Sequence, residues 1–279
     1  EREVMCRASN PAVVSLYWSF RASGTIFFVM SFARGGDLYS LLDTIGSLEE
    51  ETAIFYIAEI IEAVEYLHSL GIVHCDLKPD NILISNKGHL QLTDFGLSKF
   101  GAEKREFNSS LLFRFSEQSF PFAHPIKHAS PISKLAKNSN ENDMSQTEPV
   151  PNLRKSGLIG TPHYIAPESL LKSDYSPKVD WWAVGIIAYE LVVGQPPFIG
   201  DTESQVFASI IEGELEWPDD VEVSDDYKKF VSDLLQHNPE RRPNVETMKS
   251  YAIFKDIDFD NLFNEEAPFL PELQSTTDL

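Results

Sequence analysis

Two short polar segments of the chain carry residues that suit phosphoryl-transfer chemistry. Residues 74–81 read HCDLKPDN, and residues 94–96, which read DFG, begin thirteen positions after Asn81. Transfer of a phosphoryl group depends mainly on positioning and on stabilising charge. A carboxylate at Asp76 can receive the proton of an acceptor hydroxyl, and Lys78 can neutralise the migrating group. We therefore predict that Asp76 and Lys78 are catalytic residues.

Two further side chains in these segments suit a magnesium site. Mg²⁺ is held in such sites by one or two protein oxygen ligands together with the phosphates of a nucleotide. The carboxylate of Asp94 and the side-chain oxygen of Asn81 provide two such ligands. We predict that both bind the metal and that Asn81 also belongs to the catalytic set.

The two segments resemble the catalytic loop and the magnesium-binding motif of eukaryotic protein kinases, H-R-D-x-K-x-x-N before D-F-G. Residues 161–168, TPHYIAPE, resemble the end of the activation segment in that family. A lysine two residues after the aspartate is the pattern of the serine/threonine type. The resemblance implies a serine/threonine protein kinase (EC 2.7.11.1) that uses ATP and Mg²⁺ to phosphorylate Ser or Thr of protein substrates. It also implies that Thr161 hydrogen-bonds to Asp76 and Lys78, and the alternative is a phosphosite before Pro162.

The resemblance also implies where the nucleotide lies. Residues 28–37 resemble the kinase hinge, where backbone groups of Ser31 and Ala33 would meet adenine and Asp37 would contact ribose or substrate. Met30 would be the gatekeeper of the pocket and Leu83 part of its floor. The full set assigned to the nucleotide site is Met30, Ser31, Ala33, Asp37, Leu83, Thr93 and Glu1.

The sequence departs from the kinase pattern at two places. No glycine-rich loop or strand lysine precedes Glu1, which aligns with the helix glutamate that pairs with that lysine. We therefore expect a chain that begins partway through the small lobe, binds ATP poorly and is close to inactive by itself. A catalytically dead pseudokinase scaffold is the alternative. In addition, Cys75 replaces an arginine that pairs with a phosphorylated activation segment, and we expect a small buried side chain there rather than a redox group.

Two pairings with a structural role follow from the same resemblance. Glu168 should form an ion pair with Arg242, and Asp180 should anchor the backbone of the catalytic loop.

The elements that must position these residues can be read from hydrophobic periodicity. Apolar residues at three- and four-residue steps predict a helix over 49–70, ended by Gly71, and a continuous apolar pattern predicts a buried helix over 178–193. Amphipathic helices are expected over 205–212, 225–236 and 244–251. Strands are expected as a hairpin within 11–32 and as a second hairpin formed by 82–84 and 89–93.

The order of these elements predicts an α+β fold of the protein-kinase type, with a mostly helical large lobe and a partial β small lobe. We expect a kinase domain over residues 1–254. Ser, Asn, Pro and Lys without a period predict a flexible insertion in the activation segment over 100–155. Residues 255–279 resemble the start of a C-terminal tail.

Residues 88–99, 179–185 and 196–198 resemble the AGC group of kinases, within it the Greatwall and microtubule-associated serine/threonine kinase branch. The insertion and residues 253–271 favour a Greatwall-like kinase. That resemblance implies a role in mitotic entry and small phosphatase inhibitors as substrates. Nuclear Dbf2-related and fungal Rim-type kinases are the alternatives.

The composition excludes several other classes of function. A net charge of −20 disfavours binding to nucleic acid, so no nucleic-acid partner is expected. The longest apolar run, residues 181–189, is far shorter than the ~20 residues of a membrane span, so no membrane partner is expected. Two widely spaced cysteines indicate a reducing compartment, the cytoplasm or the nucleus. We expect a monomer.

Overall fold

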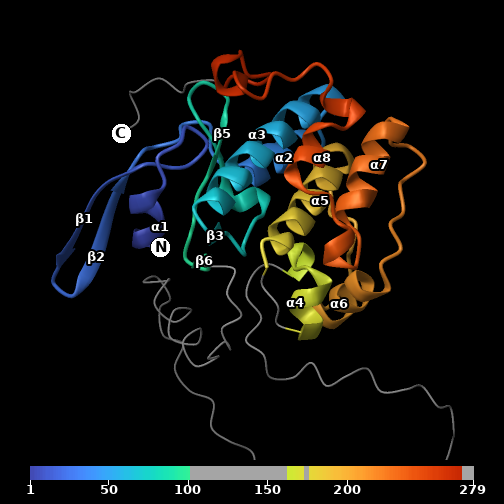
Figure 1. Ribbon diagram of the computed structural model, residues 1–279, viewed down its shortest axis with the longest axis horizontal. Coiled ribbons are helices and arrows are strands. Elements are labelled where there is room, and N and C mark those ends of the chain that lie inside the picture. The colour runs from blue at the N-terminus through green and yellow to red at the C-terminus, as the bar shows by residue number, and fades with distance from the viewer. Residues whose placement is uncertain (101–161, 173–175, 272–279) are drawn as a thin grey trace, which may run out of the picture. The chain divides into compact units, whose positions relative to one another are not determined.

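The structure, a computed structural model, describes residues 1–100, 162–172 and 176–271. The chain divides into two units, Glu1–Glu103 with Ile159–Leu279, and Lys104–Leu158. The second unit, and with it most of the predicted insertion, lies outside the described residues. The first unit combines helices with three small antiparallel sheets, so the α+β fold predicted from the sequence is confirmed (Figure 1).

The helices of the first unit are built around one central pair. Helix α3 packs along helix α5, and α5 also packs against α7 (Figure 1). Helix α5 is buried along nearly its whole length, as its continuous apolar pattern predicts, and Trp182 is fully buried. The helix bounds are α1 Arg2–Arg7, α2 Leu38–Ile45, α3 Glu50–Ser69, α4 Pro167–Lys172, α5 Lys178–Val193, α6 Glu203–Glu212, α7 Asp225–Leu234 and α8 Val245–Lys249.

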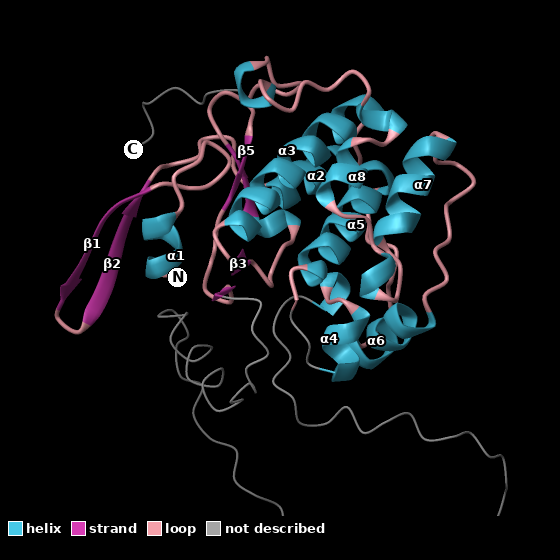
Figure 2. Ribbon diagram, in the orientation of Figure 1, coloured by secondary structure: helices cyan, strands magenta, loops and turns pink. Residues whose placement is uncertain are grey.

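Each sheet of the described chain has two antiparallel strands (Figure 2). Both predicted hairpins are present, one within 11–32 and one directly before Thr93. The third sheet joins two strands of two residues each, and the sequence pattern did not predict it. The strands are β1 Leu16–Ala22 with β2 Thr25–Met30, β3 Ile72–Val73 with β6 Lys99–Phe100, and β4 Ile82–Ile84 with β5 Leu90–Leu92.

Several helix ends differ from the sequence prediction, and capping explains them. Helix α6 begins two residues earlier than predicted because Thr202 and Gln205 form a capping box. Helix α8 is shorter than predicted because Asn244 caps its start and Ser250 already follows its end. Helix α2 was not predicted, although Asp37 caps it by accepting from the Ser40 backbone N–H at 2.7 Å.

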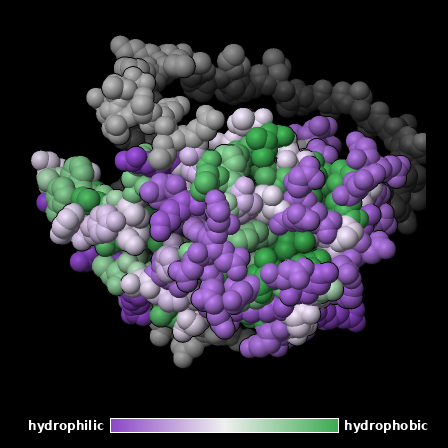
Figure 3. All heavy atoms as spheres, turned by 90° about the horizontal axis from the view of Figure 1, so that it is seen from above, coloured by the Kyte–Doolittle hydropathy of each residue, from purple (hydrophilic) through white to green (hydrophobic). Residues whose placement is uncertain are grey.

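The β1–β2 hairpin differs from the rest of the unit in its exposed apolar side chains. Trp18 is 68% exposed, Ile26 63% and Phe20 53%. Figure 3 shows apolar residues exposed at this end of the unit, as well as over its middle. Among the described residues, β1 pairs with β2 alone.

Candidate active site

One side chain of the buried helix α5 forms hydrogen bonds with the backbone of the catalytic loop. Asp180, 1% exposed, accepts hydrogen bonds from the backbone N–H of His74 at 2.8 Å and of Cys75 at 2.9 Å. The Nε2 atom of His68, at the end of α3, lies 2.8 Å from the same carboxylate. The predicted anchoring role of Asp180 is therefore confirmed, and it fixes the loop on the two central helices.

The loop brings three of the predicted catalytic residues together. The Oδ2 atom of Asp76 lies 3.3 Å from Lys78 Nζ and accepts a hydrogen bond of 3.0 Å from Asn81 Nδ2. The Asn81 amide also donates to the Asp76 carbonyl at 2.8 Å. Burial raises the pKa of Asp76, and Lys78 and Asn81 oppose that rise. The result is a buried carboxylate beside a cation, an arrangement that can accept a proton and bind an anionic group.

His74 connects this loop to the segment that carries Asp94. Its ring donates from Nε2 to the Thr93 carbonyl at 3.1 Å, and its Nδ1 accepts from the Asp76 N–H at 3.3 Å. Burial lowers the pKa of His74, which favours the neutral ring that this bonding requires. The Thr93 N–H donates to the Asn81 carbonyl at 3.0 Å. The two motifs are therefore held together through both backbone and side-chain bonds.

The donor set at this junction fits a magnesium ion. Asp94 is exposed and has a left-handed φ of 57°, and one of its oxygens accepts from the Gly96 N–H at 3.2 Å. The Asn81 amide uses its nitrogen for both bonds described above, which leaves its oxygen as a ligand. Among the described residues no group of three or more His, Cys, Asp or Glu could hold a metal. Two oxygen ligands of this kind suit a Mg²⁺ ion whose other ligands are nucleotide phosphates, and Mg²⁺ there would neutralise phosphate charge.

The predicted hinge follows β2 and pairs with Leu83, the residue predicted to form part of the floor of the pocket. The Ser31 N–H donates to the Ser15 carbonyl at 2.9 Å, so its own carbonyl is the backbone group left for adenine. Ala33 is buried, and Met30, at the end of β2, is 39% exposed. Leu83 forms an isolated bridge with Asp37. The hinge and β4 are therefore adjacent, but the contacts with a nucleotide stay predictions.

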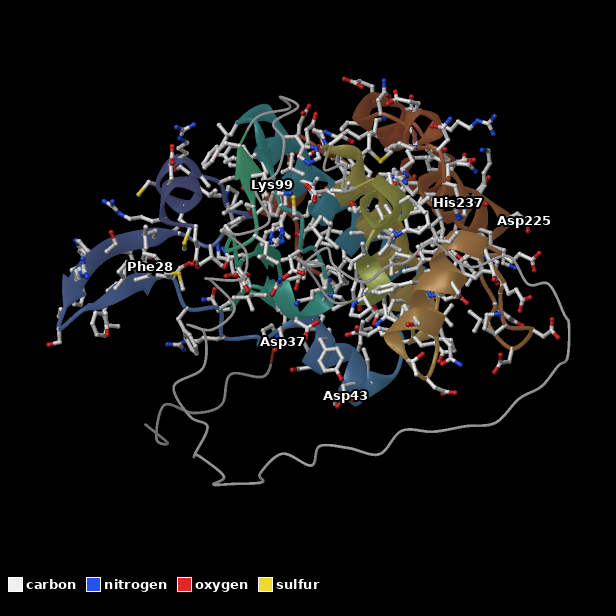
Figure 4. All side chains as sticks on the ribbon, turned by 90° about the horizontal axis from the view of Figure 1, so that it is seen from below. Phe28, Asp37, Asp43, Lys99, Asp225 and His237 are labelled. Carbon is white, nitrogen blue, oxygen red and sulfur yellow. The ribbon has the colours of Figure 1, made fainter. Side chains whose placement is uncertain are left out.

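Asp37 has a structural role in addition to the predicted one. Its carboxylate caps α2 through the Ser40 N–H and also accepts from the Ser40 hydroxyl at 3.0 Å. Figure 4 shows Asp37 at the start of this helix, with Asp43 on the same helix. Capping orients the Asp37 carboxylate. Its contact with ribose or substrate stays a prediction.

Glu1 and Thr161 complete the predicted set. The carboxyl of Glu1 is close enough to Asp94 for the two to interact, and desolvation together with that repulsion raises the pKa of Glu1. This location agrees with its alignment, and its pairing with a lysine stays a prediction. Thr161 lies outside the described residues.

One acidic group near the site was not predicted from the sequence. Tyr164 donates a hydrogen bond of 2.6 Å to Glu190 on α5, and Glu190 is only 6% exposed. Burial and, to a lesser extent, nearby Asp80 raise the pKa of Glu190 to about 7. Asp80 belongs to the catalytic loop, so a carboxyl group of this loop and that of Glu190 lie near one another. An acidic residue inside the continuous apolar run of 178–193 was the available signal.

Of the remaining two features of the site, the Glu168–Arg242 pair is as predicted, whereas Cys75 is less buried than expected. Arg242 forms two parallel hydrogen bonds with Glu168, at 2.6 and 2.7 Å, and its side chain is fully buried. Cys75 is half-buried with a left-handed φ of 65°, and its Sγ lies 3.7 Å from the Val73 carbonyl. Burial raises the pKa of the Cys75 thiol, which disfavours the reactive thiolate. The thiol therefore acts as a small packed side chain.

Comparison with known proteins agrees with this geometry. Residues 1–114 and 135–254 match the protein kinase domain family. The chain belongs to this family. It is 38% identical over its whole length to the probable serine/threonine protein kinase IRE4 of Arabidopsis thaliana, covering 25% of that protein. It is 36% identical to the serine/threonine-protein kinase Warts of Drosophila melanogaster, again over its whole length and 25% of that protein.

A yeast relative shows the same relation. The chain is 34% identical over its whole length to the serine/threonine-protein kinase CBK1 of Saccharomyces cerevisiae and covers 39% of it. The chain therefore spans between a quarter and two fifths of the length of these three relatives. In the described part of the chain no helix is long and apolar enough to cross a membrane.

Proposed function

We propose that the protein is a serine/threonine protein kinase that transfers the γ-phosphate of ATP to Ser or Thr of protein substrates. The observation that carries the proposal is the catalytic loop, in which Asp76 Oδ2 lies 3.3 Å from Lys78 Nζ and 3.0 Å from Asn81 Nδ2, and in which Asn81 bonds the residue before Asp94. Asp76 accepts the hydroxyl proton, and Lys78 neutralises the transferred group. A scaffold without activity has no need of all four residues. The names of the three relatives, each a serine/threonine protein kinase, support the same function.

The acidic group beside the loop supports a preference for basic substrates. Glu190 and Asp80 place two carboxyl groups next to the catalytic residues, and Tyr164 orients one of them. An arginine or lysine of a substrate would pair with these carboxylates and offset their mutual repulsion. We therefore expect acceptor sites that have basic residues close to the Ser or Thr.

The biological role is proposed from the motifs of the AGC group. Residues 88–99 and 253–271 favour a Greatwall-like regulator of mitosis that phosphorylates small phosphatase inhibitors, in the cytoplasm or the nucleus. The similarity to Warts and CBK1 favours a nuclear Dbf2-related kinase as the second candidate. The two candidates are distinguished by the rate at which the intact protein phosphorylates a small phosphatase inhibitor, compared with its rate on a library of basic peptides. A preference for the inhibitor supports the Greatwall-like role.

The enzymatic proposal is tested by two substitutions in the intact protein. Asp76→Asn should lower kcat about 100-fold or more and leave Mg·ATP binding unchanged, because the base is lost but not the metal site. Asp94→Asn should remove turnover and also weaken Mg·ATP binding. Phosphate transfer and calorimetric binding of Mg·ATP provide the two measurements.

Asp43→Asn is the matched control, since Asp43 is an exposed aspartate of α2 (Figure 4). Wild-type kinetics for Asp76→Asn would exclude Asp76 as the base. A wild-type protein that neither binds Mg·ATP nor transfers phosphate would establish the pseudokinase alternative.

A further inference from the structure

The turn that follows α2 lies directly against the end of α5. A Cβ built on Gly194, the C-cap residue of α5, would lie 2.6 Å from the Gly46 carbonyl oxygen. Position 194 therefore has no space for a side chain while the turn keeps its place. Gly194 also has a left-handed φ of 85°, which glycine adopts without steric cost. The close approach of the two backbones depends on glycine at this position.

A backbone hydrogen bond reinforces this contact. The Leu48 N–H donates to the Leu191 carbonyl at 2.7 Å. On the other side, Gly46 is the C-cap residue of α2. We call the contact of residues 46–48 with residues 191–194 the α2–α5 joint. It connects the end of one helix to the last turn of the other.

The α5 side of the joint carries one acid of the proposed substrate site. The Gly194 N–H donates to the Glu190 carbonyl at 2.8 Å, so Glu190 belongs to the helical turn that the joint fixes. The Glu190 side chain accepts from the Tyr164 hydroxyl at 2.6 Å. Tyr164 belongs to a short helix, Pro162–Tyr164, that packs against α5. A shift of the last turn of α5 would therefore move the Glu190 carboxyl group.

The α2 side of the joint supports the other acid. Helix α2 packs against the short helix Pro79–Asn81, whose middle residue is Asp80. Asp80 lies close enough to Glu190 for the two carboxyl groups to repel each other. The joint thus connects the helix that supports Asp80 to the helix that carries Glu190.

We propose that the α2–α5 joint sets the separation of Asp80 and Glu190 and thereby the affinity for the basic residue of a substrate. A guanidinium forms charge-assisted hydrogen bonds with two carboxylates only when their separation allows it to contact both. A backbone contact that holds this separation against their repulsion prepares the site before the substrate arrives, which lowers the cost of binding. Gly46 and Gly194 are positioning residues, because they act through the two helices. The proposal rests on the proposed function, which assigns the two acids to a basic substrate.

The test measures the binding of two probe peptides to the intact protein by fluorescence anisotropy. One peptide has an acceptor serine flanked by arginines, and the other has glutamine in place of each arginine. Gly194→Ala places a methyl group against Gly46 at a φ of +85°. We expect it to weaken binding of the arginine peptide about fivefold, to leave binding of the glutamine peptide unchanged and to speed backbone amide exchange in 38–48.

Two further glycine substitutions frame this result. Gly24→Ala is the control, since it adds a methyl group into open space at the same φ of +85°, and it should leave all three measurements at their wild-type values. Gly46→Ala strains the other side of the joint, at a φ of +88°, without a clash. It should also weaken binding of the arginine peptide alone, and it carries the test if Gly194→Ala does not fold.

A Glu190→Gln background separates positioning from a general loss of structure. In that background Gly194→Ala should weaken binding of the arginine peptide less than twofold, because the acid that it positions is already neutral. A fivefold loss there, or no loss in the wild-type background, would overturn the role of the joint. Equal binding of the two peptides by the wild type would overturn it as well. A protein that prefers the arginine peptide but transfers no phosphate would instead refute the proposed function.

Discussion

Two groups of acidic residues in the first unit differ in how many of their oxygens are already bonded. Asp180 and Glu168 use both carboxylate oxygens, Asp180 for the catalytic-loop backbone and Glu168 for Arg242. Among described residues, the side-chain bonds of Asp76 run to one oxygen, Oδ2, and Asp94 bonds Gly96 with one oxygen. The first group holds parts of the fold together, and the second has oxygens left for other groups.

This difference separates stability from chemistry although the residue types are the same. When the partner of a fully bonded, buried carboxylate is removed, the carboxylate keeps an uncompensated charge. Loss of the partner should therefore lower the free energy of unfolding. A partly bonded carboxylate in a site keeps oxygens for other groups, and the surrounding residues can make its ionised form less stable. Its loss should appear in the rate of transfer instead.

The largest expected effect on stability comes from Arg242→Ala. The side chain is fully buried, bonds Glu168 twice and also donates to the Gln236 and Lys178 carbonyls at 2.9 and 2.8 Å. Its removal leaves Glu168 buried without its partner, which costs about 3–5 kcal/mol in the free energy of unfolding. Urea denaturation of the variant measures this loss.

Arg7→Ala is the control for that substitution. Arg7 pairs with Glu3 on the surface of α1, where both side chains are more than half exposed. Such a pair contributes about 0.5 kcal/mol or less. An equal loss in the free energy of unfolding for Arg242→Ala and Arg7→Ala would contradict the view that fully bonded, buried acids stabilise the fold more than other acids do.

The sequence predicted the parts of this molecule that carry a long period or a motif. Helices α3 and α5 have 20 and 16 residues, long enough for their apolar periodicity to be recognised without the fold. Strands β3 and β6 have two residues each and exist because Ile72 and Val73 pair with residues 28 and 26 positions away. Helix α2, with eight residues, was not predicted although Asp37 caps its start.

The site divides in the same way. Asp76, Lys78, Asn81 and Asp94 lie in two motifs, so their residue types and their spacing along the chain are enough to indicate their chemistry. The contact between Tyr164 and Glu190 joins residues 26 positions apart, and only the packing of α5 brings them together.

The next largest expected effect is on the KM for a basic peptide, and it comes from Glu190, which lies near the catalytic loop and has a raised pKa. Its pKa is raised to about 7, mainly by burial, so it ionises between about pH 6 and pH 8. Pairing with a basic substrate requires the ionised form, so the KM for a basic peptide should fall about tenfold as the pH rises from 6 to 8. Glu190→Gln should raise this KM and remove its pH dependence over that range. A peptide without basic residues is the control, and an equal fall in its KM would contradict the assignment.

A small effect on stability is expected for Asp76→Asn, and it completes the comparison with Arg242→Ala. Burial raises the folded-state pKa of Asp76 above 3.8, so above pH 4 its ionised form in the folded state carries a cost. This cost grows as the pH rises through the folded-state pKa and then stays constant. Removing the charge relieves the cost but gives up the interaction with Lys78 and weakens the bond from Asn81, so at pH 7 the two changes should cancel to within about 1 kcal/mol. Urea denaturation at about pH 3, below the unfolded-state pKa of 3.8, and at pH 7 should show that the stability of the wild type relative to the variant falls as the pH rises. A loss as large as that of Arg242→Ala would show that Asp76 holds the fold together, and would remove the distinction between the two groups of acids.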